Sequence, residues 1–171
     1  WDAPGLPTKE GFGLHTYGSV DPDKVIQKVM DVDHYQGNIA HVMISHSVSD
    51  SRYQKPSAVR FYELIELSIL GNIHFEAYLK DAGMCKGYRV AYWHMLENET
   101  NALDRNTGIR NDYNDGAWFA SSTSIGYALS SAPIHEDVNT LQWSALTSGA
   151  DAAAKTVVED NINGMYAWVS R

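Results

Sequence analysis

Several polar and aromatic side chains sit at alternating positions of strand-like segments, where they could line a binding site or move a proton. A carboxylate such as Glu66 beside tyrosines in a partly dry pocket would have a raised pKa and could act as an acid or a base. A buried histidine such as His94 could serve equally. The candidate site residues are His46, Tyr62, Glu66, Tyr78, Tyr92, His94 and Trp143. Taken singly, each is more often a structural or surface residue than a functional one, so both interpretations stay open.

The spacing of the other reactive residues does not support metal, nucleophile or phosphate chemistry. His41 and His46 lie on one predicted strand at positions of opposite parity, so they point to opposite faces and cannot share one ion. Cys85 is the single cysteine, which excludes a disulfide framework and a Cys-based zinc site. The sequence has no G-x-S-x-G motif and no glycine-rich phosphate loop. We expect no metal and no cofactor, although a site built from distant histidines stays open.

Length and charge narrow the class of protein. A chain of 171 residues is expected to form a single domain, 1–171, with a real core. Hydrophobic and charged fractions of 44% and 20% are typical of soluble proteins. The net charge of −8 argues against a surface for nucleic acid or for anionic lipid. No apolar run is long enough to span a bilayer, so only transient membrane contact is left open.

The chain begins at Trp1 rather than at Met. Either a leader peptide was removed or the chain was shortened, and the sequence does not decide between the two. We lean toward an exported protein, periplasmic or secreted.

The N-terminal quarter predicts an arm, a strand and two helices. Residues 1–10 contain two prolines and a glycine and are expected to form an extended arm. Residues 11–20 alternate as a strand does. Asp21-Pro22-Asp23 is a strong helix start, because it places a capping carboxylate before a proline at the first helical position. A short second helix is expected over 31–37.

The next hundred residues have the period of two that is typical of strands. The first strand places Val42, Ile44, His46 and Val48 on one face, and the second opposes Val59, Phe61, Glu63 and Ile65 to Arg60, Tyr62, Leu64 and Glu66. Further strands are expected over 73–79, 87–96, 118–130 and 138–146, with turns at 71–72 and 81–83 and a long loop or hairpin over 103–115. A bulge would reverse the later face assignments, so which face is buried stays open.

A long amphipathic helix is expected at the C-terminus, over Asp151–Ser170. Its apolar stripe consists of Ala154, Val158, Ile162, Met165 and Val169. Such a helix is about 30 Å long, and it is the only long element available to cover the sheet. Gly164 within it indicates either close approach of the helix backbone to a ligand or a strand, or simple tolerance of glycine. One helix cannot fill the concave side of a strongly curved sheet, so we expect a pocket between them.

The segment Val25–Val42 resembles the opening of the START-related, polyketide-cyclase-like superfamily, also called SRPBCC or Bet v 1-like. In that family a helix leads through a D-x-x-x-Y segment and a short helix into the second strand, and Asp31, Asp33 and Tyr35 stand in this position here. The usual Trp or Pro after the tyrosine is replaced by Gln36-Gly-Asn38. The resemblance implies a START-like domain of the α+β class with a helix-grip fold, in which a curved antiparallel sheet wraps around a long C-terminal helix and short helices follow the first strand.

The resemblance also implies a deep hydrophobic cavity. Members of the family bind lipids, sterols, quinones or polyketides, and a minority are cyclases, dehydratases or lyases. We therefore expect a carrier that sequesters or transports an apolar small molecule, with access near 80–86 and 106–116. The alternative is an enzyme of the cyclase, dehydratase or lyase type that uses Glu66, His94 or His46 in the same cavity. A third hypothesis is an interaction module whose core is filled.

Overall fold

The computed structural model describes residues 10–67, 71–96 and 108–171. The elements in chain order are β1 (Glu10–Thr16), α1 (Pro22–Val29), the 3-10 helix η1 (Val32–His34), β2 (Val42–Val48), β3 (Ala58–Leu67), β4 (Gly71–Cys85), β5 (Tyr88–Met95), β6 (Ile109–Ala120), β7 (Ser124–Pro133), the 3-10 helix η3 (His135–Asp137) and α2 (Thr140–Val169). Except for Glu10, the expected N-terminal arm lies outside the described residues.

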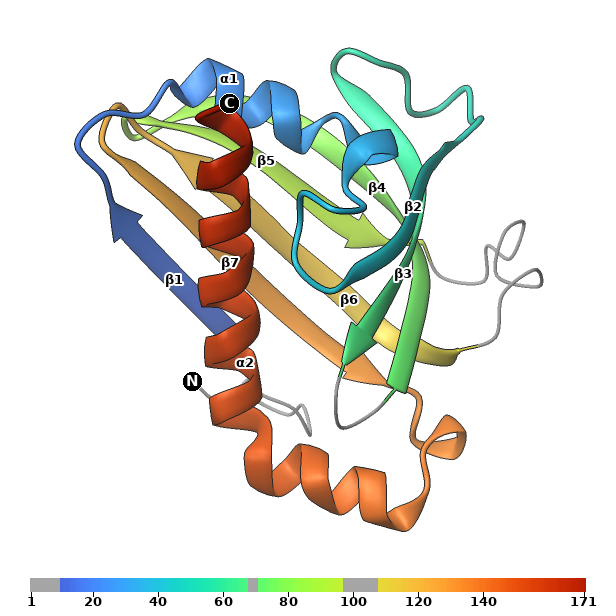
Figure 1. Ribbon diagram of the computed structural model, residues 1–171. Helices are drawn as coiled ribbons and strands as arrows, with labels where there is room; N and C mark the ends of the chain where they lie inside the picture. The colour runs from blue at the N-terminus through green and yellow to red at the C-terminus, as the bar shows by residue number, and fades with distance from the viewer. Residues whose placement is uncertain (1–9, 68–70, 97–107) are drawn as a thin grey trace.

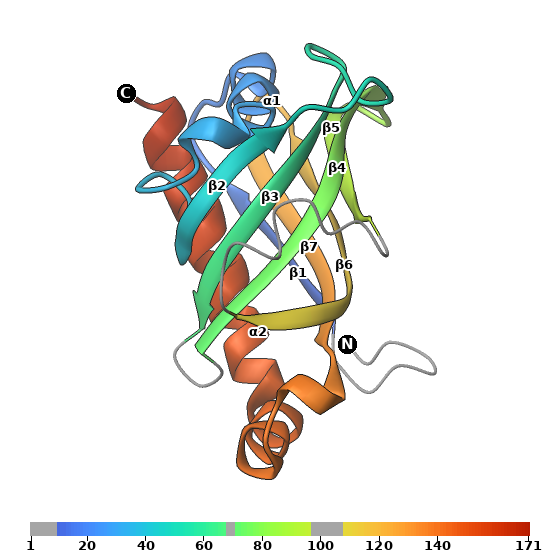
Figure 2. The same cartoon turned by 90° about the vertical axis from the view of Figure 1, so that its right-hand side faces the viewer.

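The strands form one curved, seven-stranded sheet in the order β1-β7-β6-β5-β4-β3-β2. Neighbouring strands run antiparallel, and a short parallel contact joins β4 to β6. The sheet is open, with β1 and β2 at its edges. Helix α2 crosses one face, packing on β1 and β7, while α1 packs on α2, β5 and β6 (Figure 1). We call this side the helix face and the opposite side the outer face (Figure 2). The predicted α+β helix-grip fold is confirmed.

Helix α1 begins where the sequence predicts. The Asp21 carboxylate accepts hydrogen bonds from the backbone N–H groups of Asp23 and Lys24, which otherwise have no partner in the first turn. The apolar side of the helix, with Val25 and Val29, is buried in the core.

The segment after α1 is held by the residues that carry the family resemblance. The buried Tyr35 hydroxyl donates to the backbone carbonyl of Val29. The Asp33 carboxylate accepts hydrogen bonds from the backbone N–H and the hydroxyl of Ser47, and it forms an ion pair with Lys55. Although partial burial opposes it, these donors lower the pKa of Asp33 to about 2. The motif thus holds η1 against the end of β2 and against the C-terminus of α1.

Helix α2 begins eleven residues earlier than expected, at Thr140. The Asn139 side chain caps the first turn, and the Gln142 side-chain oxygen accepts a hydrogen bond from the Asn139 backbone N–H, which makes a capping box. The expected strand over 138–146 is therefore wrong, and Trp143 lies on a helix. The C-terminal half of α2 buries Val158, Ile162, Met165, Trp168 and Val169, which confirms the predicted stripe apart from Ala154 and adds Trp168.

Three register shifts affect which side chains share a face, in β2, in β4 and, between Asn111 and Tyr113, in β6. The β2–β3 register shifts between Val42 and Ile44. As a result, Val42 joins the core of the helix face, whereas Ile44 packs with Tyr62 and Leu64 on the outer face. The expectation that Val42 shares a face with Ile44, His46 and Val48 is wrong for this reason.

The second bulge lies in β4, at Asp81/Gly83. It keeps 80–85 in the strand, where we expected a turn and access to a pocket. The residues 109–115, expected in a long loop or hairpin, belong to β6.

Gly164 marks a close approach of α2 to the segment before β2. A Cβ atom at this position would lie 2.8 Å from the backbone oxygen of Asn38. The first of the two explanations for this glycine, close approach, is therefore the one that the structure supports, and the neighbour is backbone.

Replacing Gly164 with alanine should destabilise the protein despite the better helix propensity of alanine. The gain in propensity is about 1 kcal/mol. Overpacking against a backbone atom costs about 1–3 kcal/mol and should exceed it. Asn163→Ala, on an exposed neighbouring position of α2, is the matched control and should be neutral or slightly stabilising. Urea unfolding of both variants checks this; a Gly164→Ala protein as stable as Asn163→Ala would contradict the close approach.

No helix among the described residues is long and apolar enough to cross a membrane.

Candidate functional site

The helix face carries large apolar side chains from most strands of the sheet. Phe61, Phe75, Leu79, Trp93, Trp118 and Tyr127 are buried there in one core with residues of α1 and of the C-terminal half of α2. Ile65, Met95 and Leu129 pack against the same core but remain half-exposed. The helix face is therefore filled next to α1 and more accessible toward the opposite end of the strands.

A carboxylate interrupts this apolar surface. Glu63 is nine-tenths buried on the helix face of β3, directly opposite Ser45 of β2. Among the described residues, none donates a hydrogen bond or forms an ion pair with its carboxyl group. The hydroxyl of Ser45 is buried and also lacks a partner.

Helix α2 contributes a third group of this kind. The Asn161 amide nitrogen donates to the hydroxyl of Tyr127, and its buried side-chain oxygen lacks a partner. We refer to Glu63, Ser45, Tyr127 and Asn161 as the Glu63 cluster. A buried polar atom without a partner costs about 1–3 kcal/mol, so a group of them indicates a site that is completed by a ligand or by water.

Burial sets the protonation state of the cluster. Removal from water disfavours the charged form and raises the pKa of Glu63 to about 8. Burial, with the nearby charge of Glu63, also raises the pKa values of Tyr35 and Tyr127. At neutral pH, Glu63 is therefore mainly an uncharged carboxylic acid, which can both donate and accept a hydrogen bond.

A hydrogen-bonded track runs beside the cluster on the helix face. The Trp93 indole N–H donates to Asn114 (2.8 Å), the Asn114 amide donates to Ser131 (3.2 Å), and Ser131 donates to Asn111 (3.2 Å). The track ends at the buried amide nitrogen of Asn111, which lacks a partner. Trp93 itself stacks on Tyr127 with ring centroids 5.4 Å apart, so the track is in contact with the Glu63 cluster through this pair of rings.

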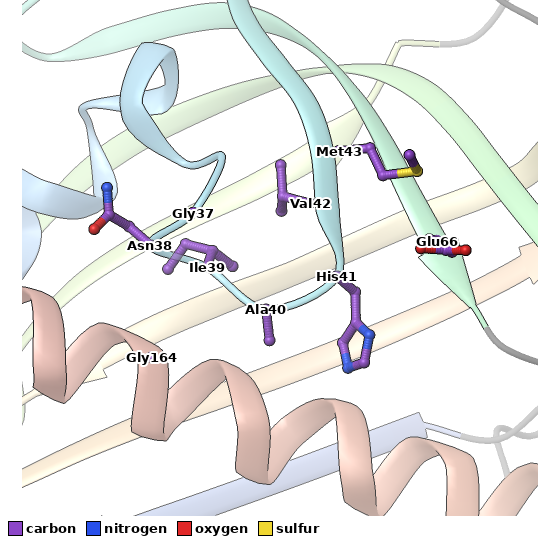
Figure 3. A pocket seen from close by; sticks show the side chains of 9 residues that line it. All are labelled: Gly37, Asn38, Ile39, Ala40, His41, Val42, Met43, Glu66 and Gly164. Atoms are coloured by element: carbon purple, nitrogen blue, oxygen red, sulfur yellow. The ribbon is translucent and has the colours of Figure 1, made fainter.

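An open pocket of about 400 Å³ lies where the segment before β2 meets α2. Figure 3 shows the lining residues, which are Gly37, Asn38, Ile39, Ala40, His41, Val42, Met43, Glu66 and Gly164. The His41 ring points toward α2 and lies 3.2 Å from the Asp160 carboxylate. None of the four residues of the Glu63 cluster lines this pocket. The two are linked through Val42, which lines the pocket and pairs with Ile65, two positions from Glu63 along β3.

The residues expected to form the site from sequence are distributed differently. Glu66 is exposed at the end of β3 and lines this pocket. Trp143 lies near the start of α2, with its ring 4.4 Å from that of His135. Neither of these two residues is in the Glu63 cluster.

The other five lie on the outer face, in two groups. His46 stacks on Tyr62, and the fully buried Tyr62 hydroxyl lies 3.3 Å from the His74 ring nitrogen. Tyr78 contacts both Tyr92 and His94, and His94 lies 2.6 Å from Asp115. A ligand held between α2 and the sheet would not contact these residues. That they bind a ligand stays a prediction, and such a ligand would lie on the outer face.

The outer face also contains a buried ion pair. Arg60 donates through Nε to Glu76 at 2.7 Å and through a terminal nitrogen to Asp50 at 3.1 Å. Arg60 and Glu76 are both almost inaccessible to solvent. This face is thus held by its own charged groups, in contrast to the unpaired carboxyl on the helix face.

Within the described residues, no group of three or more His, Cys, Asp or Glu side chains is arranged to hold a metal ion. The sequence predicts that Glu63, the main chemical group of the site, shares a face with Val59, Phe61 and Ile65, but the seven candidate residues do not include it. Its position as the single acid in an apolar stripe was the signal that could have identified it.

Comparisons with known proteins test the fold. Neither family models nor curated protein sequences give a match to this sequence. Among solved structures, the STAR-related lipid transfer protein from Xanthomonas axonopodis aligns with a TM-score of 0.72 and 12% identity, over 99% of this chain and 90% of its own. The chain has the START-like helix-grip fold. The resemblance predicted from Val25–Val42 is confirmed at this level.

Two further solved structures align over most of this chain. Human STARD10 aligns with a TM-score of 0.67 and 11% identity, over 93% of this chain and 64% of its own. The Zhui aromatase/cyclase from Streptomyces sp. R1128 aligns with a TM-score of 0.64 and 12% identity, over 95% of both chains. Lipid-transfer and cyclase proteins thus share this fold, and identities this low carry the fold alone.

Proposed function

We propose that the protein binds an apolar small molecule between α2 and the helix face of the sheet, and carries or sequesters it. The observation that supports this most is the Glu63 cluster, in which buried polar atoms without protein partners stand among apolar and aromatic side chains. The adjoining pocket and the half-exposed Ile65, Met95 and Leu129 provide access. The ligand chain would be stabilised by burial of apolar surface, at about 25 cal/mol per Å², and its polar end by the cluster.

The STAR-related lipid transfer protein with the same fold supports this proposal. A transferred ligand has to be covered on most sides, and α2 with the segment 37–43 supplies such a cover over the open side of the sheet.

A second candidate is acid–base catalysis in the same space. It is favoured by Glu63, which is protonated at neutral pH and can therefore donate a proton to a bound substrate. The cyclase with this fold supports the same possibility. Glu66 and His94, proposed from sequence for this role, lie on different parts of the surface and do not converge with Glu63. Conversion of a bound compound that stops in Glu63→Gln would favour this candidate over a carrier.

Two variants on adjacent positions of β7 test where the ligand binds. Leu129 is half-exposed on the helix face, and Ala128 points to the outer face. Leu129→Trp should block the space and weaken binding of the apolar dye Nile red at least tenfold. Ala128→Trp adds the same side chain to the opposite face and should change dye affinity less than threefold.

Dye fluorescence measures the affinities, and circular dichroism confirms that both variants fold. Native mass spectrometry of the purified parent protein, followed by solvent extraction, should in addition reveal a co-purifying apolar compound. Equal dye affinity in both variants would contradict binding on the helix face.

A further inference from the structure

We infer that the Glu63 cluster selects ligands that carry a protonated amine at the end of an apolar chain. This inference rests on the function proposed above and adds the class of headgroup to it.

The first argument is the number of free acceptors. An alkyl ammonium group has three N–H donors and no acceptor. The cluster offers the Glu63 carboxyl, the Ser45 hydroxyl and the Asn161 side-chain oxygen, of which the last two are buried atoms without a partner. Ser45 stands opposite Glu63 in the β2–β3 register, and Asn161 bonds to Tyr127, whose pKa is raised in part by the charge of Glu63. The cluster therefore offers as many acceptor groups as an ammonium group has N–H donors.

The second argument is charge. No Lys or Arg of the described residues forms an ion pair with Glu63. Arg89, which also lies on the helix side, is held near α1 by Asp23 and Asp81. A ligand carboxylate would therefore meet a second acid with no cation between them, and a ligand hydroxyl would supply one donor for three acceptors. An ammonium group supplies both the missing charge and the missing donors, which a buried ion pair needs if it is to be stable.

The protonation states give this inference a specific signature. Glu63 has a pKa of about 8, and a simple alkylamine resembles lysine, with a pKa of about 10.4. At pH 7, before binding, the amine is protonated and charged, and Glu63 is protonated and neutral. Forming the pair requires Glu63 to release its proton to the solvent, about 0.9 proton per ligand at this pH.

Other titratable groups face the same region. Tyr35 and Tyr127 have raised pKa values and stay neutral. Asp31 also contributes to the raised pKa of Tyr35, and His41 pairs with Asp160 at the rim of the pocket. Proton release that disappears when Glu63 is replaced comes from Glu63 and not from these other groups.

Isothermal titration calorimetry with decylamine, decanol and decanoate tests the inference. At pH 7, decylamine should bind at least tenfold more tightly than decanol, and decanoate more weakly than either. Titrations in two buffers with different heats of ionisation should show release of about 0.9 proton with decylamine and none with decanol. Between pH 7 and pH 9, decylamine affinity should rise by up to about tenfold as Glu63 loses its proton without ligand.

Glu63→Gln should abolish the proton release and bring decylamine and decanol within threefold of each other. Ala128→Trp, on the outer face, should keep the preference for the amine. Equal binding of decylamine and decanol to the parent protein, or an unchanged preference in Glu63→Gln, would overturn the amine inference while leaving the proposed function intact. If none of the three compounds binds, the proposed function fails as well.

Discussion

Replacing Glu63 with glutamine should remove a loss of stability that the parent protein undergoes between pH 5 and pH 8. The folded protein holds the Glu63 proton up to a pKa of about 8, whereas the unfolded chain releases it near the ordinary value of 4.5. Between these values the folded state binds the extra proton, so its stability is fully present at low pH and falls as the pH rises. The slope from this one group is about 1.4 kcal/mol per pH unit.

The difference in unfolding free energy between Glu63→Gln and the parent should therefore grow by about 4 kcal/mol from pH 5 to pH 8. Urea unfolding at four pH values measures it. Tyr127→Phe is the matched control, because it removes another hydroxyl of the same cluster whose raised pKa lies above this range. Its difference from the parent should be constant with pH. A constant difference for Glu63→Gln would show that the carboxyl group is hydrated in the folded protein.

Breaking the ion pair on the outer face should produce the second large effect. Arg60→Met leaves Glu76 buried without its partner, and losses of this kind are about 3–5 kcal/mol. The double variant Arg60→Met/Glu76→Leu removes both charges and should recover most of the lost stability, because well-packed apolar residues replace a buried pair at little cost.

The ion pair of Arg110 with Asp137 is the control, because it is partly exposed. Arg110→Met should destabilise by less than about 1 kcal/mol. Urea unfolding of the three variants compares these values. If Arg60→Met lowers the unfolding free energy no more than Arg110→Met does, the Glu76 carboxylate is in contact with water. Dye binding, corrected for the folded fraction, should stay at the parent level in Arg60→Met, because this residue lies on the face away from α2.

The fold could be predicted from sequence because its signals are local. Asp21-Pro22 determines where α1 begins, and alternating residues identify the strands that follow. The sequence predicts a strand over 138–146 because too few apolar residues there recur at helical spacing. The structure shows that the capping box of Asn139 and Gln142 starts a helix instead. Side-chain periodicity alone does not distinguish short helical and extended segments.

The site could be predicted only in part, because it depends on contacts distant in sequence. A single bulge in β2 moves His46 to the outer face, and Tyr62 and Tyr78 follow the same parity on β3 and β4. Glu63 joins Asn161 and Tyr127 only after the sheet curves around α2, which no local pattern encodes. The sequence does indicate that Glu63 shares a face with Phe61 and Ile65. Because that face is otherwise apolar, the same pattern also predicts that the Glu63 carboxyl group is buried.

The location of the ligand is the central claim, and the methionines of the chain allow a direct test. Met95 and Met165 lie on the helix side, whereas Met84 is 64% exposed. With ¹³C-methyl-methionine protein and decylamine or decanol, whichever binds more tightly, the measurement is the nuclear Overhauser effect between the alkyl chain and each methyl group. We expect contacts to the half-exposed Met95 and none to Met84, while the fully buried Met165 reports whether the ligand also enters the filled part of the core. Contacts to Met84 alone, or none to Met95 at saturating ligand, would contradict binding between α2 and the sheet.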